Sequence, residues 1–163
     1  MMREINTLYH SRESANMLIK HLYSVEKTNM LYHKVLANRV HDGRLKRLFV
    51  EQLLPAVERK KQSLFLIIRL MDLHPHDGST AGINGIMDEC FQEIEDMENE
   101  EMVDDIILHT MVVLLHYELG NYRMLLSYLR NVELDFQITI IEDILDREEH
   151  ILDLLMDILK IEQ

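Results

Sequence analysis

The chain has 163 residues, a mass of 19.4 kDa and a formal net charge of −12, with 47% hydrophobic and 28% charged residues. These values are typical of one globular domain, residues 1–163, and they exclude collagen-like and disordered proteins. Because only five Gly, two Pro and one Cys are present, an all-β fold with frequent turns and a disulfide framework are also excluded.

The first two helices are predicted from apolar residues that recur at three- and four-residue steps. The first covers residues 11–40, and the second covers residues 44–73. Asp42 and Gly43 interrupt the pattern between them, and Asp42 is the expected N-cap of the second helix. Pro55 lies inside the second helix and should kink it, because proline lacks the backbone donor and its ring clashes with the preceding turn.

The second half of the chain predicts one short and two long helices. The Gly- and Pro-rich stretch 74–82 is the longest expected connection, and a short helix follows at 83–97. Asn99 then begins a long helix that runs to about 130, and after a turn at 131–135 the last helix covers 136–160. Two short links and one long central crossover predict an all-α, ferritin-like antiparallel four-helix bundle, with an extra short helix between its second and third long helices.

Polar residues interrupt the apolar stripes of three long helices. Glu118 and Glu148 stand at positions that the helical spacing assigns to the interior. In the first helix, Glu26 shares one face with Asn29 and His33. An isolated ionised carboxylate is costly in a core, so these glutamates are expected to be paired, protonated or bound to metal.

Several kinds of site are compatible with these glutamates. Bundles build di-iron and di-manganese sites from two single Glu ligands and two Glu-x-x-His motifs, but here Arg147 precedes His150 and Glu58 precedes Lys61 at that spacing. In one alternative, Lys61 and Arg147 are buried cations that replace the metal charge. In another, a partial or rearranged metal site is formed by Glu26, Glu58, Glu118, Glu148 and His150. A rotated helix would instead leave these groups in solvent.

Four motifs, in order along the chain, resemble those of the YciE/YciF family of ferritin-like, stress-associated bacterial proteins. The first is Tyr-Ser-Val-Glu-Lys at 23–27, similar to the family's Tyr-Ser-Ala-Glu-Lys. The second lies at 82–90, the third is His-Tyr-Glu-Leu at 116–119 followed by Tyr122, and the fourth lies at 144–148. Together they extend the resemblance over about residues 15–160.

This resemblance implies a ferritin-like fold, a stress-associated role and a homodimer. It also implies that Glu26 and Glu118 match metal ligands, whereas Leu54, Pro55 and Arg147 stand where the family has acids. The main prediction is therefore a structural or interaction protein with a degenerate di-iron site and no cofactor. The alternative is an iron or manganese enzyme, an oxidase or a peroxide-handling protein.

The charge is divided unevenly along the chain. Residues 1–69 hold 13 Lys and Arg against 6 Asp and Glu, while residues 70–163 hold 4 against 23. This division indicates charge complementarity within the chain or between copies, and the long acidic stretch argues against nucleic acid as a partner. The run at 111–115 has five apolar residues, far fewer than the roughly 20 that span a bilayer, so no membrane partner is expected. The amino end lacks a signal-peptide core, which predicts a cytoplasmic protein.

Overall fold

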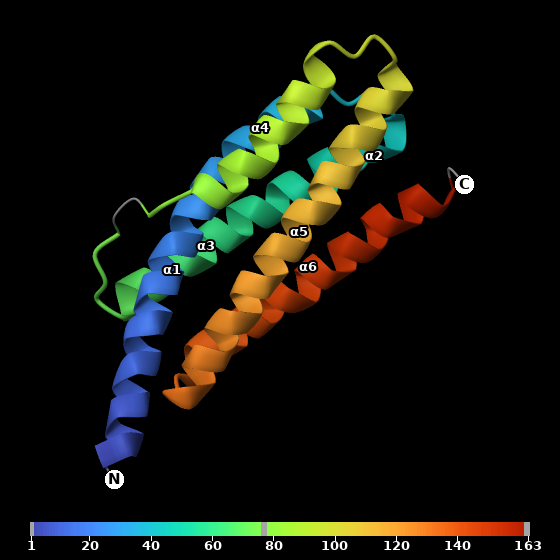
Figure 1. Cartoon of the computed structure of the whole chain (residues 1–163). Helices are drawn as coiled ribbons and strands as arrows, with labels where there is room; N and C mark the ends of the chain where they lie inside the picture. Colours follow the sequence, from blue (N-terminus) through green and yellow to red (C-terminus); the bar gives the residue numbers. More distant parts are fainter. Residues whose placement is uncertain (1, 76–77, 162–163) are drawn as a thin grey trace.

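The computed structural model describes residues 2–75 and 78–161, and all of its regular elements are helices (Figure 1). They are α1 (Met2–Ala37), α2 (Gly43–Leu48), the π-helical turn η1 (Phe49–Leu53), α3 (Leu54–Leu70), α4 (Ala81–Glu95), α5 (Glu100–Asn131) and α6 (Asp135–Ile161). This order confirms the predicted ferritin-like bundle, with α4 as the extra short helix. Within the described ranges, no helix is both long and apolar enough to cross a membrane.

Four long elements make up the bundle, as two antiparallel pairs. The most extensive helix contacts join α5 to α6, α1 to α3 and α1 to α5, while the contact between α3 and α6 is smaller. The segment from residue 71 to residue 80 carries the chain from α3 to α4 and supplies the long crossover (Figure 1). The helix boundaries lie close to the predicted ones, except that α1 begins nine residues earlier than expected, at Met2.

Side-chain caps fix two of the helix starts, and the first of them is the N-cap that the sequence predicts. Asp42 accepts hydrogen bonds from the backbone N–H groups of Arg44 and Leu45, at 2.9 and 2.8 Å. Asn99 accepts from Glu101 and Met102 at 3.0 and 3.3 Å. Both caps satisfy donors that have no partner within the helix, so the chain turns sharply into α2 and α5.

A π-helical turn just before Pro55 interrupts the predicted second helix. The backbone N–H of Leu54 donates to the carbonyl of Phe49, five residues earlier, which closes η1. Pro55 then lies in the first turn of α3, where a missing backbone donor is tolerated. The wider turn therefore accommodates a residue that an uninterrupted α-helix would not.

The core consists of two apolar clusters separated by a polar layer. One cluster lies around α4 and includes Leu36, Phe49 and Met111, and the other lies near the α5–α6 turn and includes Leu64 and Ile141. Each is buried by residues from all the long helices. The layer between them contains four buried charged side chains, one from each long helix.

The short helix α4 covers one end of the groove between α1 and α5. Its buried face consists of Ile83, Met87, Cys90 and Ile94, each at most 2% exposed. A Cβ atom on Gly82 would lie 2.8 Å from the hydroxyl of Tyr117 on α5, so the first turn of α4 packs tightly there. Because α4 begins at Ala81, it leaves the groove uncovered on the side that lies before its first turn (Figure 1).

One buried carboxylate joins the turn after α1 to α5. Asp104 accepts hydrogen bonds from the backbone N–H groups of His41 and Asp42, at 2.8 and 2.6 Å. We expect Asp104→Ala to lower the free energy of unfolding by about 1–3 kcal/mol, because two backbone donors lose their acceptor. Asp105→Ala changes an exposed neighbour and should stay within about 0.5 kcal/mol of the parent. Urea unfolding of both variants measures the difference, and equal effects would contradict this role of Asp104.

Candidate functional site

The polar layer is centred on the side-chain ammonium of Lys60. Its Nζ lies 3.0 Å from Glu118 Oε1, 3.0 Å from Glu148 Oε2 and 3.3 Å from Glu26 Oε2. None of the four side chains is more than 4% exposed. The layer is therefore one ammonium enclosed by three carboxylates in the interior of the bundle.

Each of the four long helices contributes one member of this cluster. Glu26 comes from α1, Lys60 from α3, Glu118 from α5 and Glu148 from α6. The apolar clusters on either side hold all four helices together, so the charged ends meet away from bulk water. The Lys60 ammonium donates hydrogen bonds to Glu118 and Glu148, whereas its contact with Glu26 Oε2 is an ion pair without a hydrogen bond.

A second set of polar side chains orients the carboxylates. The hydroxyl of Tyr122 donates to Glu26 Oε1 at 2.7 Å, and Asn29 Nδ2 donates to Glu118 Oε1 at 2.5 Å. His33 Nδ1 lies 2.8 Å from the carbonyl oxygen of Asn29, which can only accept, so the proton is on Nδ1. These bonds orient Glu26 and Glu118 and extend the polar layer along α1 and α5.

Burial and mutual charge shift the protonation of the cluster. Burial, followed by the charge of Glu26, raises the pKa of Glu118 to about 8. Burial also raises the pKa of Glu26 and of Glu148, against the opposing effect of the Lys60 ammonium. Glu118 therefore keeps its proton at neutral pH, which reduces the excess of negative charge around Lys60.

The pKa values of the two basic groups in the layer, Lys60 and His33, are shifted in opposite directions. Burial alone would lower the pKa of Lys60, but the charges of Glu118, Glu148 and Glu26 outweigh it and hold that pKa well above its ordinary value. Burial, assisted by the Lys60 charge, lowers the pKa of His33 to about 3. At neutral pH Lys60 is thus a cation without a free electron pair, unsuited to Schiff-base or nucleophilic chemistry, and His33 is neutral.

The structure brings together three of the predicted site residues and separates the others. Glu26, Glu118 and Glu148 meet at one point, as their positions on the apolar stripes indicate. Glu58 is half-buried at the surface of α3, where it accepts from Lys61 and Gln62 at 2.7 and 2.9 Å. His150 is exposed on α6. Glu58 and His150 therefore do not join the carboxylate cluster.

The predicted buried cations are wrong in both positions. Lys61 has a 30% exposed side chain paired with Glu58, and Arg147 has a 53% exposed side chain paired with Asp143 at 2.8 Å. The cation that enters the cluster is Lys60. Adjacent helix positions point about 100° apart, so Lys60 faces inward while Lys61 faces out, and Glu148 faces inward while Arg147 faces out.

A weak signal for Lys60 is present in the sequence. Ala56, Lys60, Leu64 and Ile67 recur at steps of four, four and three, and all four are buried. The competing stripe through Lys61 fits the helical period equally well. The orientation of α3 against its neighbours, which the spacing does not contain, decides between the two lysines.

The cluster does not fit an iron or manganese pair. The Lys60 ammonium lies between the three carboxylates, where a metal cation would be repelled by its charge. In the described ranges 2–75 and 78–161, no group of three or more His, Cys, Asp and Glu side chains is placed to hold a metal ion. The five residues predicted for the alternative metal site are also separated, because three lie in the core and two lie at the surface.

A small cavity connects the cluster to the surface between α3 and α6. Its volume is about 130 Å³, and Lys60 and Glu148 form its inner wall. Arg59 and Arg147 lie at its outer side. A cavity of this volume with several polar side chains in its lining is large enough for water.

Comparisons with known proteins agree with this fold. The model of the family described as "Domain of unknown function (DUF892)" matches residues 16–163. The Escherichia coli stress protein YciF superposes with a TM-score of 0.84 and 18% identity, over 91% of this chain and 93% of that chain. YcfI, a proposed structural protein from Rhodopseudomonas palustris, gives 0.84 and 14% identity, over 89% and 92%. No curated protein matches the sequence.

Removing the central cation should destabilise the bundle strongly. We expect Lys60→Met to lower the free energy of unfolding at pH 8 by about 3–5 kcal/mol, because three buried carboxylates lose their counter-charge. Lys61→Met is the matched control and should cost less than about 1 kcal/mol, since Lys61 forms only a partly exposed pair. Urea unfolding should show a smaller Lys60→Met penalty at pH 5, where the acids take up protons. Equal penalties for the two variants would contradict the central position of Lys60.

The protonation of Glu118 predicts a loss of stability with rising pH. The folded protein keeps this proton up to about pH 8, whereas an unfolded glutamate loses it near 4.5, so the free energy of unfolding falls between these values. His33 acts in the opposite direction only below its unfolded value of 6.5, because it stays neutral in the fold down to about pH 3. Between pH 6.5 and 8 the effect of Glu118 is therefore unopposed by His33.

Glu118→Gln tests this assignment because the amide keeps the acceptor oxygen and removes the titration. Glu26 and Glu148, whose pKa values are also raised, leave a residual slope of the same sign. We expect a clearly smaller fall in the urea-unfolding free energy of Glu118→Gln from pH 6.5 to pH 8 than in the parent. Parallel curves for the two proteins would assign the pH dependence to other groups.

Proposed function

Because this chain belongs to the DUF892 family, we propose that it is a stress-associated structural or interaction protein of the YciF type. In this proposal the protein works as a cytoplasmic homodimer, its dimetal centre is degenerate, and it needs no metal. The stress role rests on the printed description of YciF, and the structural role rests on that of YcfI.

The Lys60 ammonium at the centre of the three glutamates carries the proposal. Inward carboxylates require a compensating positive charge, and a protein-derived cation supplies it permanently. A bundle stabilised in this way does not depend on the supply of iron or manganese. The central ammonium also leaves no open coordination position for a substrate, which favours a structural role over the oxidase and peroxide-handling alternative.

The proposed homodimer is supported by the unevenly distributed charge and by exposed apolar side chains. The basic first half and the acidic second half offer complementary surfaces to a second copy. Several large apolar residues are also at least 40% exposed, among them Leu31, Val50, Leu70 and Phe136. Burial of part of this surface would stabilise an assembly of two chains.

Metal content and mass test the two parts of the proposal separately. After expression with added iron, manganese and zinc, elemental analysis should find far less than one metal per chain, and the melting temperature should not change on addition of metal or of a chelator. Light scattering should give about twice the 19.4 kDa chain mass. Recovery of about two metals per chain, with a metal-induced rise in melting temperature that Glu118→Ala abolishes, would instead support the enzyme. A monomeric mass would refute the homodimer alone.

A further inference from the structure

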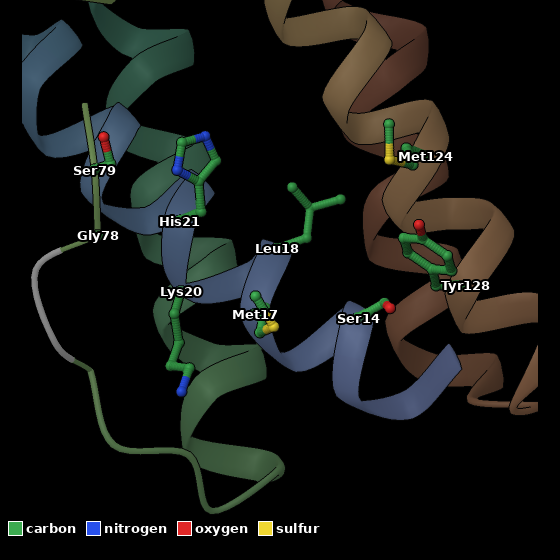
Figure 2. Close-up of a pocket in the computed structure, with 9 residues that line it drawn as sticks. All are labelled: Ser14, Met17, Leu18, Lys20, His21, Gly78, Ser79, Met124 and Tyr128. Atoms are coloured by element: carbon green, nitrogen blue, oxygen red, sulfur yellow. The ribbon is translucent and has the colours of Figure 1, made fainter. Parts of the chain in front are cut away.

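A second, larger cavity lies in the groove between α1 and α5 that α4 leaves uncovered. Its volume is about 500 Å³, within the range of small-molecule sites. The chain segment at Gly78 and Ser79 forms its edge on the side of α4. Figure 2 shows the residues that line the cavity, with this segment at the left, α1 in the centre and α5 at the right.

The walls of this cavity are mainly apolar. Met17 and Leu18 line it from α1, and Met124 and Tyr128 line it from α5 (Figure 2). Met17 is 70% exposed and Met124 is 50% exposed, so two long apolar side chains face solvent across the groove. Unbranched methionine side chains adapt to ligands of different shape, and a flexible alkyl chain can follow such walls.

The charge of the lining is opposite to that of the protein as a whole. The chain has 29 acidic residues and a net charge of −12. Among the described residues that line the cavity there is no Asp or Glu, whereas Lys20 and His21 are present at the side of the Gly78–Ser79 segment (Figure 2). This combination selects for a ligand with an anionic end and an apolar body.

We propose that the α1–α5 cavity binds a free medium-chain fatty acid. The alkyl chain lies between the two methionines, against Leu18 and the ring of Tyr128, and the carboxylate lies toward Lys20 and His21. Methylene groups transferred from water to these apolar walls supply the affinity, and the basic end sets the orientation. This site is separate from the Lys60 cluster and does not depend on the proposed structural function.

Calorimetric titration with carboxylates of six to twelve carbons, below their micelle concentrations, tests the ligand class. Each added methylene should tighten binding about three- to fourfold until the cavity is filled, as expected for transfer of one CH₂ group from water. Alkylammonium ions of the same lengths should bind at least about tenfold more weakly, because their charge matches that of Lys20. Affinity that is independent of chain length, or equal for both charge types, would overturn the proposal.

Two pairs of variants locate the binding site. Met124→Asp places an acid in the cavity and should weaken decanoate binding more than about tenfold. Met102→Asp alters an equally exposed methionine, 48% exposed on the same helix but outside the cavity, and should leave binding unchanged. Lys20→Gln should weaken binding about two- to fivefold, while Lys34→Gln, an exposed lysine farther along α1, should not.

Other occupants of the groove give different results in the same experiments. If a second copy of the chain covers it, Met124→Asp will change the mass measured by light scattering, and the parent protein will not bind decanoate. If the groove serves a lipid surface, the protein will sediment with anionic vesicles and will not bind the free acid. Equal loss of binding in Met124→Asp and Met102→Asp would also overturn the proposal. Metal content and the homodimer can fail without affecting this result.

Discussion

The structure depends on the neutralisation of carboxylates in the buried interior of the bundle. Glu26, Glu118 and Glu148 project inward from three helices, and their desolvation is tolerated only because Lys60 supplies a cation from the fourth. Each pair alone would be a weak source of stability, since burial of both charges costs about as much as their attraction returns. Their joint geometry instead fixes how the four helices are rotated, because any other rotation leaves a buried charge without a partner.

Protons neutralise the part of the negative charge that one lysine cannot balance. With three carboxylates and one ammonium, the cluster would carry excess negative charge if every acid were ionised. The raised pKa of Glu118 removes part of that excess, and the hydrogen bonds from Asn29 and Tyr122 stabilise the carboxyl groups that accept them. Bundles with several inward glutamates can therefore be neutralised by metal ions, by protons or by a basic side chain, and the chemistry available to the protein differs among these cases.

The short helix α4 relates the core to the surface cavity. It covers the α1–α5 groove only from Ala81 onward, where Ile83 and Met87 are fully buried. The rest of the groove keeps the apolar character of a helix interface while Met17 and Met124 remain exposed. One groove thus serves as core at one end and as a candidate ligand site at the other, because the covering helix is shorter than the helices that form the groove.

The sequence by itself determined the helices, the Asp42 cap and the inward positions of the three glutamates, because hydrophobic periodicity and capping are local properties of the chain. It assigned the buried cation to Lys61 instead of Lys60, and it assigned Arg147 an inward position that the structure does not show. Neighbouring residues on a helix differ by about 100° in direction, and apolar spacing fixes the orientation of a helix only to about that precision. The packing of α3 and α6 against α1 and α5 decided which charged side chain entered the core, where the groove stayed open and which residues line it.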